Sequence, residues 1–105
     1  MKPYKIRINS DALLDIQEAT NWYNNQVPKL GARFQSDVIK QINLLKRNAL
    51  NHNIRYKNVR CVLIKKFPFL IHFVADEANK IVDVFAIIHT SRSPKIWEKR
   101  IKEIR

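Results

Sequence analysis

The spacing of the apolar residues changes near Tyr56, and that change limits the folds the chain can adopt. Between residues 13 and 49 the apolar residues recur every three or four positions, as they do on one face of a helix. After Tyr56 they occupy nearly every position of short segments, which is typical of strands covered on both faces. The order predicts an α+β fold in which helices pack on a mainly antiparallel sheet.

Two amphipathic helices are expected in the first half of the chain, after a short alternating strand over residues 4–8. Asn9 and Ser10 are candidate N-caps, and Asp11 adds a favourable negative charge to the first turn. The apolar face of this first helix comprises Leu13, Ile16, Ala19, Thr20 and Tyr23. The second helix starts near Pro28 and carries a stripe of Leu30, Phe34, Val38, Ile42, Leu45 and Ala49. Because their connection is short, the helices should form an antiparallel hairpin.

Three strands and a last helix are expected in the second half. The strand patterns cover residues 59–64, 69–75 and 81–89, and the short turns between them favour antiparallel pairing. Pro94 begins a helix in which Trp97, Ile101 and Ile104 share one face. The complete order is β-α-α-β-β-β-α, a helical hairpin packed on a curved, mainly antiparallel four-stranded sheet with a C-terminal helix. We expect residues 1–105 to form one domain, because no linker or repeat divides them.

The charge balance points to an acidic partner. Lysine and arginine number 20 against 9 acidic residues, for a net charge of +11, so the surface attracts polyanions or acidic proteins. The single cysteine, Cys61, cannot form an internal disulfide, and no His/Cys spacing suggests a metal or other cofactor. The chain start lacks the apolar core of a signal peptide, and no apolar run is long enough to span a membrane. We therefore expect a cytoplasmic protein with no membrane partner.

The cations gather around the first strand after the hairpin and near the C-terminus. The candidate target- or phosphate-binding residues are Arg55, Lys57, Arg60, Lys65, Lys66 and Arg92. On an antiparallel sheet, the loop after Ile88 and the lysines near Phe67 should converge on one rim, which would suit phosphates or acidic side chains. The alternative is a solvated polar face, which is what runs of charge usually are.

His89 is the candidate residue for proton transfer. It ends an apolar strand and is followed by Thr90, Ser91 and Arg92, so it could act as a general acid or base near neutral pH. The alternative is a structural histidine that hydrogen-bonds the neighbouring loop. If the chain is a nuclease, the catalytic set would be His89, Arg60 and Arg92.

Several other polar and aromatic residues are expected to be structural. His72 should be a packed, hydrogen-bonded histidine, and Cys61 a small core residue. Asp15 and Glu18 should cap the first helix or pair with lysines. Trp22 and Tyr23 should anchor the helices on the sheet.

Four segments, in chain order, carry a resemblance to a known family. They are residues 12–23 with Trp22-Tyr23, residues 30–34, Arg60 together with 66–73, and residues 86–97 with His89 and Arg92. Together they resemble the RelE/ParE superfamily of toxins from type II toxin–antitoxin systems, and most closely its ParE branch. The resemblance spans almost the whole chain and implies a growth-arresting toxin that is neutralised by a cognate acidic antitoxin.

The two branches imply different targets. RelE-like toxins cleave mRNA in the ribosome and usually carry an arginine in the strand occupied here by residues 69–71, whereas this chain has Phe67-Pro68-Phe69 and no tyrosine after Tyr56. ParE-like toxins resemble this chain in that respect and inhibit DNA gyrase by protein contact, without catalysis. The resemblance therefore favours a gyrase inhibitor. The alternatives are a ribosome-dependent mRNA endonuclease and a plain binding module for RNA or an acidic protein.

Overall fold

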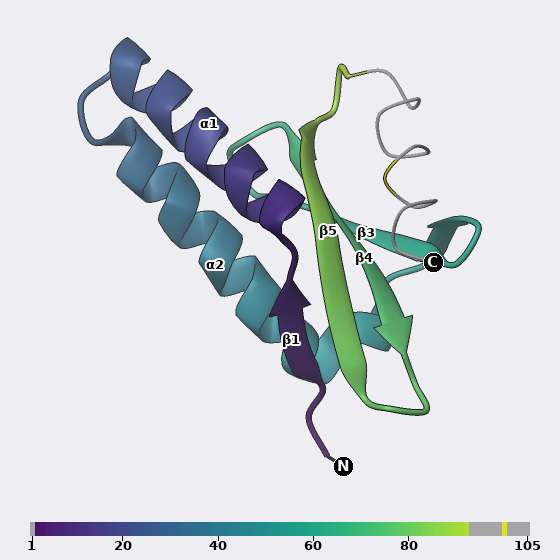
Figure 1. Ribbon diagram of the computed structural model, residues 1–105. Helices are drawn as coiled ribbons and strands as arrows, with labels where there is room; N and C mark the ends of the chain where they lie inside the picture. The colour runs from purple at the N-terminus through teal and green to yellow at the C-terminus, as the bar shows by residue number, and fades with distance from the viewer. Residues whose placement is uncertain (1, 93–99, 101–105) are drawn as a thin grey trace.

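The chain folds as a helical hairpin packed on one face of a mixed sheet (Figure 1). The computed structural model describes residues 2–92 and Arg100. The elements are β1 (Lys5–Ile8), α1 (Ser10–Gln26), α2 (Leu30–Asn48), the 3-10 turn η1 (Ala49–Asn51), β2 (Ile54–Tyr56), β3 (Val59–Leu63), β4 (Phe69–Asp76) and β5 (Ile81–His89). The strand order is β1-β5-β4-β3-β2, with β1 parallel to β5 and the other pairs antiparallel.

The predicted α+β class is confirmed, but the sheet has five strands where four were expected. The additional strand is β2, which pairs with β3 through Ile54 and Tyr56 with a shift in register between them. Its three residues are too few to show a readable alternation, and only Tyr56 is partly buried. The helix predicted from Pro94 onward falls on residues 93–105, which lie outside the described part of the chain except for Arg100.

The residues just before α1 and α2 determine where each helix begins. The Asn9 carboxamide oxygen accepts a 3.0 Å hydrogen bond from the Ala12 N–H, which confirms Asn9 as the N-cap of α1. Helix α2 begins at Leu30 rather than at Pro28, because Lys29 before it adopts a left-handed conformation with φ 72°. Pro28 therefore lies in the turn between the helices.

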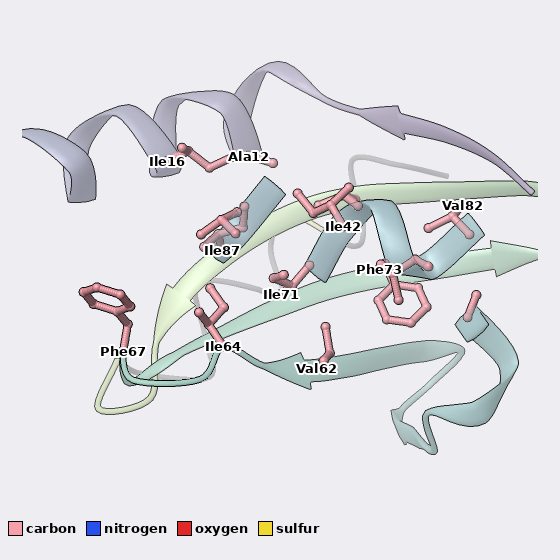
Figure 2. Packing of buried hydrophobic residues seen from close by; sticks show 14 of the residues in the cluster. Ala12, Ile16, Ile42, Val62, Ile64, Phe67, Ile71, Phe73, Val82 and Ile87 are labelled. Carbon is pink, nitrogen blue, oxygen red and sulfur yellow. The ribbon is translucent and has the colours of Figure 1, made fainter. Parts of the chain in front are cut away.

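The main core lies between the hairpin and the sheet. The predicted stripe of α2 is buried through Phe34, Val38, Ile42 and Leu45, and it meets sheet residues such as Phe73. Figure 2 shows Ala12 and Ile16 on the sheet side of α1. The buried face of α1 is rotated from the one expected, since Leu13 is 54% exposed while its neighbour Ala12 is fully buried. A smaller cluster around Val59, Phe85, Ala86 and Ile88 forms on the other face of the sheet.

Gly31 sets the distance between the two helices. Its N–H donates a 2.8 Å hydrogen bond to the Asn24 side chain on α1. A Cβ atom at this position would lie 2.2 Å from the Thr20 carbonyl oxygen and 2.6 Å from the Asn24 Cγ atom. The backbone oxygen cannot move away like a flexible side chain, so this crossing requires glycine.

We predict that Gly31→Ala lowers the free energy of unfolding by about 1–3 kcal/mol, because the added methyl group forces α1 and α2 apart. Urea denaturation measures the change. Gln35→Ala, an exposed substitution on the same helix, is the control and should leave stability within about 0.5 kcal/mol of the parent chain. Equal stability of Gly31→Ala and the parent would contradict the close approach.

Candidate functional site

Two loops meet at one end of the sheet. The Thr90 N–H after β5 donates a 2.8 Å hydrogen bond to the Pro68 carbonyl oxygen in the loop between β3 and β4. Phe69 stands opposite His89 in the register of β4 and β5. The loop that carries Lys65 and Lys66 and the loop that carries Arg92 therefore lie side by side, as the sequence predicted. We call these three exposed cations the rim.

The imidazole of His89 is tied to its own loop. Its Nδ1 atom accepts the Ser91 N–H at 3.1 Å and lies 2.8 Å from the Ser91 hydroxyl oxygen. A backbone N–H can only donate, so Nδ1 must be unprotonated and the neutral ring carries its proton on Nε2. In this arrangement Nε2 can donate a hydrogen bond but has no lone pair with which to accept a proton. The geometry suits a donor to an anionic partner better than a general base.

A hollow of about 180 Å³ lies between α1 and the end of β5. Its lining combines charged and apolar side chains, namely Asp15, Glu18, Ala19, Phe69, Ile87, Ile88, His89, Arg92 and Arg100. A second hollow, of about 330 Å³ and mainly apolar, shares Ala19, Phe69 and His89 with the first and adds Trp22, Tyr23 and Pro68. The shared residues place the two hollows next to each other, and we call them together the α1–β5 groove.

Trp22 differs from its predicted role. Tyr23 does anchor α1, since its ring packs on Phe34, Phe67 and Phe69 at centroid distances of 5.3, 5.0 and 6.1 Å. The Trp22 side chain instead lies on the solvent side of Tyr23 and is 58% exposed. The expectation that Trp22 anchors the helix on the sheet is therefore wrong. An exposed tryptophan beside an apolar hollow is a typical protein-contact residue.

Asp15 connects three parts of the chain at the base of the groove. One of its carboxylate oxygens accepts the Ile87 N–H at 2.9 Å. The Arg100 guanidinium binds both oxygens, at 2.5 and 3.0 Å, and the two side chains are only 13% and 22% exposed. The sequence analysis expected Asp15 to cap a helix or pair with a lysine. It missed this cluster because the partners lie 72 and 85 positions away.

The predicted nuclease set is not brought together. Arg60 stands opposite Phe73 on β4, while His89 stands opposite Phe69, so about 13 Å of strand separates their positions. The Arg60 guanidinium donates to the carbonyl oxygens of His52 at 2.6 Å and Leu50 at 3.4 Å, where it caps the end of η1. Arg92 does line the groove with His89.

The remaining predicted cations, Arg55 and Lys57, belong to the β2–β3 hairpin. Arg55 lies on β2, and Lys57 follows in the turn with a left-handed φ of 48°. Arg60 pairs with Ile54 in the same hairpin. The six predicted target-binding cations thus fall into two groups, the rim and the β2–β3 hairpin.

A polar cluster on the face opposite the helices surrounds His72, as predicted for a packed, hydrogen-bonded histidine. The Tyr56 hydroxyl lies 3.1 Å and the Cys61 Sγ atom 3.4 Å from its Nδ1 atom. Burial, followed by the charges of Arg55 and Arg100, lowers the pKa of His72 to about 4. Burial also raises the pKa of the Cys61 thiol to about 11, so this thiol stays protonated at neutral pH.

Two classes of site can be assessed over residues 2–92 and Arg100. Within this part of the chain no three histidine, cysteine or acidic side chains group together as metal ligands would. No helix there is both long and apolar enough to cross a bilayer.

Comparison with known proteins identifies the fold. No family model matches the sequence, and the search of curated proteins returns no match. Among solved structures, a chain of the chromosomal ParDE toxin–antitoxin system from P. aeruginosa is similar with a TM-score of 0.73, 17% identity, and coverage of 84% of this chain and 97% of that one. The toxin RelE of E. coli is similar with a TM-score of 0.71, 11% identity, and coverage of 98% and 99%.

A third similar structure is the RelBE2 toxin–antitoxin complex of Mycobacterium tuberculosis, with a TM-score of 0.60, 17% identity, and coverage of 83% of this chain and 98% of that one. The chain thus has the fold of the RelE/ParE toxins, as the sequence resemblance predicted. The TM-scores of the ParDE chain and of RelE are nearly equal, so the fold does not separate the two branches.

We predict that Asp15→Ala lowers the free energy of unfolding by about 2–4 kcal/mol, because it leaves the Ile87 N–H and the Arg100 guanidinium without their shared acceptor. Urea denaturation gives the value. Glu18→Ala, one turn further along α1 and exposed, is the matched control. A double-mutant cycle of Asp15→Asn with Arg100→Gln should show a coupling of at least about 1 kcal/mol, and additive effects would contradict the pair.

We predict that the stability of the fold rises with pH between about 4 and 6.5 through His72. The unfolded chain has the ordinary histidine pKa of about 6.5, so within this window it binds a proton that the folded chain, with a pKa of about 4, does not. The contribution, on the order of 2–3 kcal/mol, is complete above pH 6.5 and is lost as the pH falls. As the pH falls from 6.5 to about 4, the unfolding free energy of the parent should fall more steeply than that of His72→Gln. Parallel curves would refute the assignment to His72.

Proposed function

We propose that this protein is the toxin of a type II toxin–antitoxin system, that it arrests growth by inhibiting DNA gyrase through protein contact, and that a cognate acidic antitoxin neutralises it. The observation that carries the proposal is the placement of the rim beside the α1–β5 groove. A mainly apolar depression with an exposed tryptophan and flanking cations is suited to a protein surface of complementary charge. The RelE/ParE fold and the net charge of +11 also support a toxin with an acidic protein partner.

Features of the candidate catalytic residues favour inhibition by contact over cleavage of RNA. Arg60, which a nuclease would need near the scissile phosphate, is bound to the carbonyl oxygens of Leu50 and His52, about 13 Å along the sheet from the position of His89. His89 presents its protonated Nε2 atom, whereas abstraction of a 2′-hydroxyl proton needs an unprotonated nitrogen. The RelE-like alternative retains one point in its favour, since His89 and Arg92 line a common hollow.

We predict that the purified protein inhibits the ATP-dependent supercoiling of relaxed plasmid by DNA gyrase. The triple variant Lys65→Glu/Lys66→Glu/Arg92→Glu should need at least a tenfold higher concentration for half-inhibition, because it reverses the charge of the rim. The control Lys2→Glu/Lys5→Glu/Lys80→Glu has the same net charge but alters exposed residues near the opposite end of the sheet, and it should match the parent.

Unchanged supercoiling at saturating protein would refute the proposed target. Cleavage of mRNA in a translating extract, lost in His89→Ala, would instead support the endonuclease alternative. Growth arrest on expression, relieved by co-expression of an adjacent acidic open reading frame, would test the toxin assignment itself.

A further inference from the structure

The outward side of α2 carries a straight row of hydrogen-bond donors. Arg33, Ser36, Lys40, Asn43 and Arg47 recur every three or four residues, and all five are exposed. At 100° per residue, they lie opposite the buried stripe of Phe34, Val38, Ile42 and Leu45. We call these five residues the α2 pole. Figure 1 shows α2 lying alongside α1 in the hairpin.

The two helices of the hairpin have opposite charge. Helix α1 contains Asp11, Asp15 and Glu18 and no lysine or arginine, whereas α2 contains four cations and a single acid, Asp37. A solvated helix face usually mixes both signs, which gives pairs of opposite charge three or four residues apart. Asp37, which is half-buried, follows Arg33 by four residues and precedes Lys40 by three, but it forms no salt bridge with either of them. The pole itself contains three cations and no acid.

The N-terminal end of the pole continues into a shallow basic hollow of about 450 Å³. Lys29 and Arg33 border it from the start of α2, and Lys66 borders it from the loop between β3 and β4. Ala32, Ser36 and Asp37 complete the lining. Three cations from two separate segments thus surround a space beside the Ser36 side chain.

We propose that the α2 pole binds the phosphate backbone of duplex DNA. The row extends about 21 Å from Arg33 to Arg47, with Lys40 midway, so successive cations stand about 10 Å apart. This spacing is comparable to the roughly 12 Å width of the major groove, so a helix lying across the groove brings two cations to the phosphates on its borders. The choice of DNA over RNA rests on the proposed function, because gyrase acts on duplex DNA.

The composition of the pole suits contacts to phosphate. Arginine and lysine bind phosphate oxygens by charge, and the serine hydroxyl and asparagine amide are neutral donors commonly used for the same atoms. Binding carried by such contacts is strongly weakened by salt.

The experiment measures binding of a fluorescent 20-base-pair DNA duplex by anisotropy over a range of NaCl concentrations, with no gyrase present. The triple variant Arg33→Gln/Lys40→Gln/Arg47→Gln should bind roughly 10- to 100-fold more weakly at 0.1 M salt. Its plot of log K against log[NaCl] should be shallower by about 2–3, since each lost phosphate contact removes about 0.9 from the slope. Thermal melts should coincide, because all three side chains are exposed.

The control variant Lys2→Gln/Lys5→Gln/Lys80→Gln removes the same amount of charge from residues outside the pole. Lys5 alternates with Ile6, which packs beneath the helices, so Lys5 faces the opposite side of the sheet. Binding that falls equally in both triple variants would reduce the effect to net charge and overturn the proposal. Tighter binding of duplex RNA than of DNA, or displacement of the DNA by polyglutamate at equal charge concentration, would overturn the assignment to DNA.

The DNA-binding experiment and the gyrase supercoiling assay can fail independently of each other. If gyrase is inhibited but the pole variant binds DNA like the parent, the pole has no role in DNA binding and the gyrase proposal stands. If the pole is required for DNA binding but supercoiling proceeds unaffected, the target is wrong and the DNA-binding surface stands.

Discussion

The hydrogen bond between the Asp15 carboxylate and the Ile87 N–H satisfies a backbone donor of β5 that lies beyond its pairing with β1. Strand β1 pairs with β5 only as far as Ile8 and Val84, and no other strand among residues 2–92 pairs with the rest of that edge. Helix α1 covers this edge, and Asp15 supplies the acceptor that a longer β1 would have provided. A largely buried carboxylate needs a counter-charge, which Arg100 provides through two hydrogen bonds. The position of α1, and with it the α1–β5 groove, depends on this cluster.

The scarcity of glycine links the turns of the chain to its charge. The only glycine, Gly31, lies at the close crossing of α1 and α2. Among the described residues, the left-handed backbone positions are occupied by four lysines, namely Lys29, Lys57, Lys66 and Lys80. Each such conformation costs on the order of 1 kcal/mol in a residue with a Cβ atom. In return, every one of these turns presents a cation to solvent. The positive surface is therefore partly built into the backbone geometry of the loops.

The sequence predicted what depends on repeated spacing and missed what depends on single distant contacts. The stripe of α2 was predicted because Phe34, Val38, Ile42 and Leu45 repeat the helical period. The convergence of the rim followed from antiparallel pairing alone. By contrast, the Asp15–Arg100 pair joins residues 85 positions apart, and no local pattern marks either partner. Trp22 was predicted to anchor α1 on the sheet, but its side chain is 58% exposed, and only its neighbour Tyr23 packs into the core.

Lys66 connects the rim with the hollow at the N-terminal end of the α2 pole. Lys66 belongs to the rim through its loop and also borders the hollow at the start of α2. A protein partner in the α1–β5 groove and a phosphate backbone along α2 would therefore meet at Lys66, on the same side of the hairpin end. An enzyme that holds DNA offers both surfaces at once, whereas free DNA or a free acidic protein engages only one. Under the two proposals taken together, the DNA-bound form of gyrase would engage both surfaces at Lys66.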